Sequence, residues 1–237
     1  MKVFLYFILE PLSFLIYFGA LFFYSWKVDR KFPYRVLCGY YLIATALLAK
    51  GSVGYSTNTT NTYIYNMMYL ITSVCLGYFF YAILQSKVKK GIAVAMGVVT
   101  IIYYLFSDTT VNNIQLFDSI GHVISSSGIV LLIFLFLHQV MTNVNEEPLS
   151  HNFDFWYVCS LLIYHLGAFA IFLSYNYFNR KVLPAENYSD ENRTILSYLW
   201  VGHNVLLLLG ALLTSVGAGW IFYKKKSHLP RQMVNQK

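Results

Sequence analysis

The chain has 237 residues, of which 57% are hydrophobic, 19% aromatic and only 11% charged. Soluble domains contain roughly 25% charged residues, so this composition excludes an ordinary soluble domain and indicates a membrane protein. The net charge is +7, but the basic residues lie in short clusters beside apolar runs, and no nucleic-acid-reading motif accompanies them. We therefore expect the lipid bilayer, and no nucleic acid, as a partner.

Seven apolar runs approach or exceed the length of about 20 residues that a helix needs to cross a bilayer. In chain order they are 3–26, 34–51, 62–85, 91–106, 116–141, 155–178 and 194–223. The loops between them are short, so sequential helices should be antiparallel neighbours. The sequence predicts an all-α integral membrane protein in which residues 1–237 form a single seven-helix transmembrane domain, ending in a short basic tail, 224–237.

The distribution of Lys and Arg predicts the orientation of the bundle. Twelve of the 17 basic residues fall in the first loop, in the third loop and after residue 223, and five fall on the other side. Because basic residues favour the cytoplasmic side, we expect the N-terminus outside and the C-terminus in the cytoplasm. The expected location is a plasma membrane or a bacterial inner membrane, which the chain crosses several times.

Several ionisable side chains occupy one level of the predicted bundle, between the outer surface and the midplane. They are Glu10 in the first run, His122 in the fifth, His165 in the sixth and His203 in the seventh. Polar groups at this depth are costly, so they usually face the bundle interior and a partner. The predicted ligand-binding residues are Glu10, Tyr17, Asn66, His122, His165, Trp200, His203 and Asn204.

Three functional interpretations of this layer remain open. A cavity lined by Tyr, Trp, Asn, His and a carboxylate suits a small polar or amphipathic ligand. Intramembrane histidines and carboxylates also serve proton or ion paths. A metal site is the third, with zinc or iron as the ion or with haem as the cofactor. Its predicted ligands are Asp118, His122, His165 and His203, of which the first two are spaced i, i+4.

A purely structural role competes with all three, because a single histidine in a membrane bundle often only hydrogen-bonds neighbouring helices. No His-x-x-x-His or His-Glu-x-x-His spacing strengthens the metal hypothesis, and no catalytic residue is assigned. Seven helices with an outer N-terminus resemble rhodopsins and receptors in architecture alone. A retinal protein needs a lysine in its last helix, and 194–223 contains none, so no retinal is expected.

The first functional expectation is a membrane sensor or receptor-like signalling module. It would bind a small ligand in the outer half of the bundle and relay the signal to a separate cytoplasmic protein, because the tail is too short to be a domain. The alternative is a metal- or haem-binding membrane enzyme or redox protein that uses the His, Asp and Glu cluster. An ion- or proton-coupled transporter is the third.

Overall fold

The computed structural model describes residues 8–56, 62–107, 117–142, 148–181 and 190–234. Within these ranges every regular element is a helix, and seven of the helices are long and apolar enough to cross a membrane. The predicted all-α bundle with seven spans is therefore confirmed for the described residues. The elements are α1 (Leu9–Lys27), α2 (Phe32–Ser56), α3 (Thr62–Ile83), α4 (Lys87–Phe106), α6 (Ser119–Thr142), the short 3₁₀ helix η2 (Leu149–His151), α7 (Phe153–Lys181) and α8 (Asp190–Val234).

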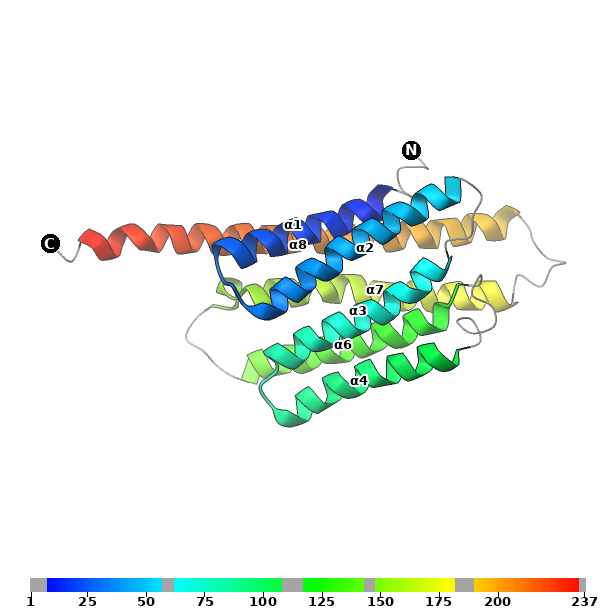
Figure 1. Cartoon of the computed structure of the whole chain (residues 1–237), viewed down its shortest axis with the longest axis horizontal. Helices are drawn as coiled ribbons and strands as arrows, with labels where there is room; N and C mark the ends of the chain where they lie inside the picture. Colours follow the sequence, from blue (N-terminus) through cyan, green and yellow to red (C-terminus); the bar gives the residue numbers. More distant parts are fainter. Residues whose placement is uncertain (1–7, 57–61, 108–116, 143–147, 182–189, 235–237) are drawn as a thin grey trace.

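Several helices are longer than the apolar runs that predicted them. Helix α4 begins at Lys87 rather than at residue 91, and α8 covers Asp190–Val234 rather than 194–223. Apolarity marks the part of a helix that can lie in hydrocarbon, whereas lysine and other charged residues are good helix formers outside it. Residues 224–234 of the predicted basic tail thus continue α8, and this end of α8 projects past the other helices (Figure 1).

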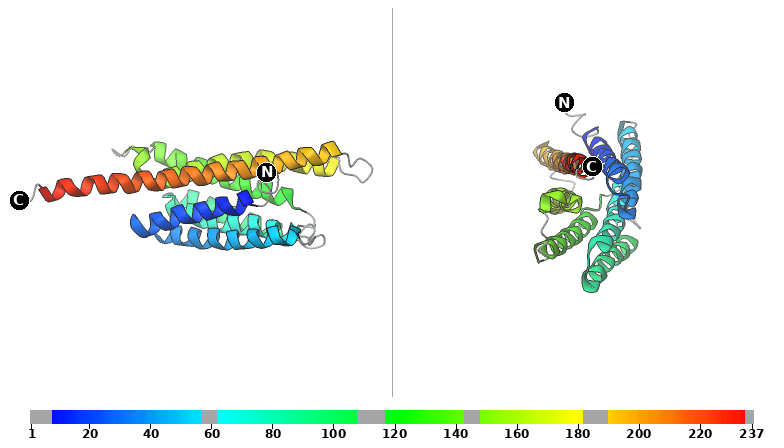
Figure 2. Two further views of the ribbon diagram at one scale, coloured as in Figure 1. Left: turned by 90° about the horizontal axis from the view of Figure 1, so that it is seen from above. Right: turned by 90° about the vertical axis from the view of Figure 1, so that its left-hand side faces the viewer.

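Six helices form a closed ring, and α4 lies outside it. Successive contacts run from α1 to α2, α3, α6, α7 and α8, and α8 returns to α1. Helix α4 packs only against α3 and α6 in this arrangement, as the end-on view of Figure 2 shows. We call the end of the bundle that carries Lys27, Lys87 and Lys225 the basic end.

The outward faces of the helices are apolar. On α4 the buried residues are Ala93 and Thr100 alone, while Val94, Val98 and Ile102 are about half exposed. Such a continuous apolar surface is unfavourable in water but matches the hydrocarbon of a bilayer. Contact with lipid therefore follows from the packing as well as from the composition.

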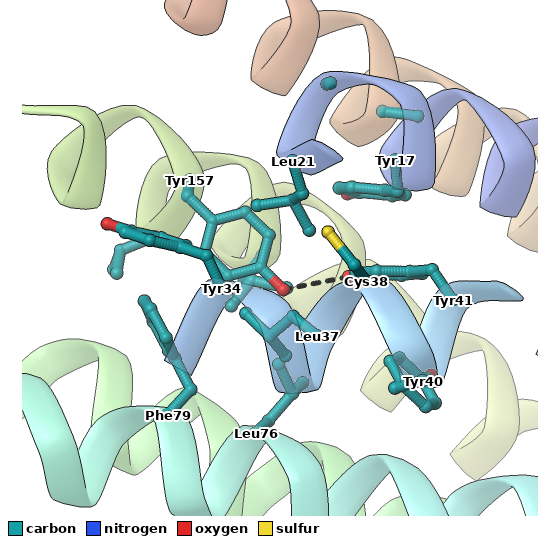
Figure 3. Close-up of a cluster of buried hydrophobic side chains, with 14 of the residues drawn as sticks. Tyr17, Leu21, Tyr34, Leu37, Cys38, Tyr40, Tyr41, Leu76, Phe79 and Tyr157 are labelled. Atoms are coloured by element: carbon teal, nitrogen blue, oxygen red, sulfur yellow. Dashed lines mark hydrogen bonds between the residues drawn. The ribbon is translucent and has the colours of Figure 1, made fainter. Parts of the chain in front are cut away.

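A cluster of aromatic rings fills the core between the middle of the bundle and its basic end (Figure 3). Tyr17 stacks on Tyr41 with ring centroids 4.7 Å apart, and the hydroxyls of Tyr41 and Tyr157 lie 3.0 Å apart. Phe79 meets the ring of Tyr157 edge-on at 5.0 Å. This tyrosine cluster joins α1, α2, α3 and α7 across the ring through ring packing and the contact of the Tyr41 and Tyr157 hydroxyls. Among the described residues the buried Tyr17 hydroxyl has no hydrogen-bond partner.

Hydrogen bonds tie the helices together at the basic end. The Tyr34 hydroxyl donates to the carboxylate of Asp154 at the start of α7. Lys225 on α8 donates through Nζ to the carbonyl of Val28, 2.9 Å away, just beyond α1. Lysine at the end of a helix satisfies carbonyls that have no partner within the helix, so α8 is connected to α1 at this end.

Candidate functional site

A cavity of about 40 Å³ lies in the half of the bundle opposite the basic end. All six helices of the ring line it, because each contributes side chains from one inward-facing stripe. Five of the eight predicted ligand-binding residues meet there, and Tyr17, Asn66 and Asn204 do not line it. The lining residues are Glu10, Phe14, Tyr40, Tyr65, Met68, Tyr69, Thr72, His122, Ser125, Ser126, Tyr164, His165, Phe172, Trp200 and His203.

Glu10 is the one carboxyl group among the residues that line this cavity. It lies in the first turn of α1, beside Pro11, and only 5% of its surface is exposed. The Tyr65 hydroxyl of α3 donates to Glu10 Oε2 over 3.3 Å. A buried carboxyl with one long hydrogen bond retains capacity to accept further hydrogen bonds, which a ligand can use.

His203 is fully hydrogen-bonded. Its Nδ1 lies 3.1 Å from Asn204 Oδ1, and its Nε2 lies 2.8 Å from the Tyr164 hydroxyl. An amide oxygen only accepts, so Nδ1 of His203 carries a proton. In the neutral ring Nε2 then accepts the hydroxyl proton of Tyr164, which fixes the imidazole between α7 and α8.

His122 and His165 differ from His203, because each has a buried ring nitrogen that finds no hydrogen-bond partner among the residues described by the structure. These atoms are His122 Nε2 and His165 Nδ1. The His122 ring packs against Phe172 at 4.5 Å, and the His165 ring meets Tyr164 at 4.7 Å. A buried polar atom without a partner is costly and rare in folded proteins. The Tyr17 hydroxyl, outside the cavity, is the third such atom among the described residues.

Aromatic rings surround Trp200, which lines the cavity on the side away from the basic end. The Trp200 ring lies 5.1 Å from Tyr65, 5.8 Å from Phe117 and 5.4 Å from His203. We call Tyr65, Phe117 and Trp200 the aromatic cap. They come from α3, from the residue pair before α6 and from α8, so the cap can open only if those helices or side chains move.

Asp118, a predicted metal ligand, accepts hydrogen bonds from several elements through its carboxylate. It immediately precedes α6, and its Oδ1 accepts from the backbone N–H of Gly121 at 2.9 Å, which is the geometry of a helix N-cap. The hydroxyls of Tyr69, Tyr103 and Ser107 also donate to this carboxylate, at 3.0, 3.1 and 3.2 Å. Its oxygens are therefore occupied by hydrogen bonds from α3, from α4 and its end, and from α6.

The predicted metal-ligand set is not assembled. Among the residues that the structure describes, no three His, Cys, Asp or Glu side chains lie close enough to hold one metal ion. The Phe172 ring packs against both His122 and His203, at 4.5 and 5.1 Å. Asp118 and His122 keep the i, i+4 relation, since the His122 N–H donates to the Asp118 carbonyl at 3.2 Å, but the Asp118 carboxylate is engaged in capping α6.

The three predicted residues outside the cavity contact other residues of the core instead. Asn66 accepts the backbone N–H of Asp118 through Oδ1 at 2.9 Å, and Asn204 holds His203. Tyr17 belongs to the tyrosine cluster, with its hydroxyl toward α8. A Cβ on Gly210 would lie 2.3 Å from that hydroxyl, so α8 needs glycine there.

Sequence analysis missed Tyr65, Tyr164 and Phe172 as lining residues. Each lies in a helix crowded with aromatic residues, so composition alone does not distinguish it. Tyr65 and Tyr164 adjoin the candidates Asn66 and His165 in the sequence, but this does not indicate which way each ring points, and Phe172 has no candidate residue beside it. A comparison of the chain with protein-family models, with curated proteins and with solved structures finds no match.

Proposed function

We propose that this chain is a multi-pass membrane sensor that binds a small polar ligand in the cavity and relays binding to a separate protein at the basic end. The observation that carries the proposal is the pair of unpartnered nitrogens, His122 Nε2 and His165 Nδ1, in the wall of a cavity that also contains Glu10. The excess of basic residues favours a cytoplasmic location for the basic end, and our proposal accordingly has the cavity in the outer half of the membrane.

The size and lining of the cavity indicate the class of ligand. A water molecule needs roughly 10–15 Å³ of such volume, so about 40 Å³ accommodates a guest of a few non-hydrogen atoms. Glu10 and the rings of Tyr65 and Trp200 favour a cation with N–H donors, because aromatic faces and carboxylates both attract cations. We therefore propose a small amine, and larger amines would require the aromatic cap to open.

The route of the relay begins with the helices that such a ligand would join. Glu10, His165 and His203 lie on α1, α7 and α8, so a guest that contacts all three alters the spacing of these helices. Tyr40 lines the cavity and packs against Tyr41 at 4.7 Å, which connects the guest to the tyrosine cluster. Helix α8 extends from the cavity to Val234, beyond the basic end, and would carry the movement outward.

Thermal unfolding of the purified protein tests ligand binding. Methylammonium and ethanolamine should raise the Tm in a concentration-dependent way, because a ligand that binds only the folded state stabilises it. Acetate should not raise the Tm, since its negative charge would be repelled by the carboxyl group of Glu10. Glu10→Gln and His165→Leu should abolish the shift, and His151→Ala, in η2 at the basic end, should leave it intact. An equal shift in Glu10→Gln would contradict the amine site.

Distance measurements test the relay separately. Spin labels on Lys27→Cys and Ser227→Cys, in a background with the three native cysteines replaced, report the spacing of α1 and α8 at the basic end. Methylammonium should change this distance in the protein that retains Glu10 and not in Glu10→Gln. An unchanged distance at saturating amine would remove signalling from the proposal, and uptake of the amine into proteoliposomes would favour the transporter alternative.

The metal- or haem-binding alternative has its own measurement. The cavity is far smaller than the 300–1,000 Å³ typical of pockets that hold drug-sized ligands or cofactors. An absorption spectrum and a metal analysis of the purified protein should show no haem band and no stoichiometric zinc or iron. If the purified protein contained a bound metal that was lost in His203→Ala, the metal-binding alternative would replace the sensor proposal.

A further inference from the structure

A groove of about 610 Å³ runs between α1 and α2 at the basic end, well away from the central cavity. Three of its large apolar side chains are exposed: Phe22, Trp26 and Leu42, at 44%, 60% and 50%. The groove therefore opens outward, toward the surrounding lipid. Its lining consists of Phe18, Phe22, Ser25, Trp26, Arg30, Arg35, Cys38, Gly39 and Leu42.

The two walls of the groove differ in shape. On α1, Phe18, Phe22 and Trp26 recur every fourth residue and stack in a row, with ring centroids 5.6 and 5.3 Å apart. On α2 the wall includes Gly39, and a Cβ built there would meet no atom within 4 Å. An apolar row facing an open helix surface accommodates a flexible hydrocarbon chain, which packs by dispersion along its length.

Two arginines distinguish the mouth of this groove. Arg30 follows α1 and Arg35 lies in the first turn of α2, and both side chains are exposed. Within the part of the chain that the structure describes, neither arginine forms an ion pair, and the neighbouring Asp29 is paired with Lys31 at 3.1 Å. Arginine binds phosphate oxygens through two parallel N–H groups.

A second surface groove provides an internal comparison. It has a volume of about 350 Å³, lies between α3 and α4, and is lined without any basic residue. Its residues include Val74, Gly97 and Ile101. The acyl chains of any lipid can cover such an apolar surface. The α1–α2 groove differs from it because Arg30 and Arg35 lie at its mouth.

We propose that the α1–α2 groove binds one anionic phospholipid from the leaflet at the basic end. An acyl chain lies along the row of Phe18, Phe22 and Trp26, and the headgroup phosphate sits between Arg30 and Arg35. Basic pockets between membrane helices on the cytoplasmic side recognise anionic headgroups in this way. The lipid site stands independently of the amine site, because the two share no residue.

Native mass spectrometry of the purified full chain in detergent tests the charge requirement. Phosphatidylglycerol should bind in preference to phosphatidylcholine with the same acyl chains, and inorganic phosphate in excess should not displace it. Arg30→Gln with Arg35→Gln should weaken phosphatidylglycerol binding about thirty-fold, roughly fivefold for each basic residue. Lys87→Gln with Lys90→Gln removes the same charge at the same end and should have little effect.

Filling the groove tests its shape. Gly39→Leu places a side chain in open space, so the helix should fold while binding of phosphatidylglycerol falls at least tenfold. Gly97→Leu is the matched control, since Gly97 also has no neighbour within 4 Å and lines the other groove. Unfolding temperatures of all variants confirm folding. Equal losses in the arginine and lysine pairs, or unchanged binding in Gly39→Leu, would overturn the proposal.

Discussion

Residues of the same type have different environments in the central cavity. His203 uses both ring nitrogens, toward Tyr164 and Asn204, whereas His165 has a buried Nδ1 without a partner. The first arrangement positions a ring between two helices. The second costs stability in the absence of a guest, and groups kept at such a cost are typical of binding sites.

Replacing the two histidines by leucine should therefore have opposite effects on stability. His203→Leu orphans the Tyr164 hydroxyl and removes the hydrogen bond to Asn204, and should lower the free energy of unfolding by about 1–3 kcal/mol. His165→Leu removes an unsatisfied polar atom, and should leave stability unchanged or raise it by up to about 1 kcal/mol. Thermal unfolding in detergent provides the comparison. A larger loss in His165→Leu than in His203→Leu would show that His165 is the structural residue.

Asp118 should behave as a structural residue. Asp118→Ala removes a helix cap worth about 1 kcal/mol and leaves donors such as Tyr69 and Ser107 without their acceptor, at a further cost of about 1–3 kcal/mol. Asp29→Ala, which removes only the exposed pair with Lys31, should cost less than about 1 kcal/mol. Unchanged stability in Asp118→Ala, together with a lost response to methylammonium, would instead assign Asp118 to ligand binding.

At the scale of elements, α8 packs closely against its neighbours through small residues. Gly210 accommodates the Tyr17 hydroxyl of α1, and Thr214 donates to Ser160 Oγ of α7 at 2.8 Å. Small residues at the interface allow helix backbones in a membrane to approach, so that packing and hydrogen bonds replace the hydrophobic effect. The residue contacts of α8 thus extend from the cavity, through Gly210, to Lys225 at the basic end.

Alanine substitutions on α8 test this packing. In Gly210→Ala the new methyl group would lie 2.3 Å from the Tyr17 hydroxyl and 3.0 Å from the Ser160 carbonyl oxygen, so stability should fall by about 1–3 kcal/mol. Gly219→Ala meets nothing within 4 Å and should be neutral or stabilising by up to about 1 kcal/mol. Adding Tyr17→Phe should restore part of the loss in Gly210→Ala. Full additivity of the two changes would show that the contact is unimportant.

At the scale of the whole molecule, the closed ring of six helices separates an inner surface from an outer one. The inner surface holds the cavity and the tyrosine cluster, and the outer surface holds the α1–α2 groove and the exposed face of α4. Ring closure through α1 and α8 brings Glu10 and His203 to one cavity although they are distant in sequence. The proposed ligand site and the proposed lipid site therefore lie on different surfaces of helix α1.

Reporter fusions test the orientation of the bundle. In a bacterial host, green fluorescent protein fused after Ser86 or after Lys226 should fluoresce, because both positions lie at the basic end, which we place in the cytoplasm. Alkaline phosphatase fused after Ser107, at the opposite end of α4, should be active. The reverse pattern would place the cavity in the cytoplasmic half and exclude a ligand that enters from outside.

The sequence by itself determined the fold class, because seven apolar runs of sufficient length leave the backbone few alternatives in a bilayer. It also selected Glu10, His122, His165, Trp200 and His203, since polar or amphipathic groups at one depth tend to share the interior. The ends of α4 and α8 were not predictable in this way, because helix propensity continues where apolarity stops.

Only the tertiary structure decided what each polar residue does. Asp118 and His122 have metal-ligand spacing in the sequence, but the helix start turns Asp118 toward Tyr69 and Tyr103. Tyr164 enters the site because α7 and α8 pack side by side, which brings its hydroxyl to His203 across 39 positions of sequence. Hydrogen-bond satisfaction depends on distances of about 3 Å between different helices, and local sequence patterns do not encode such distances.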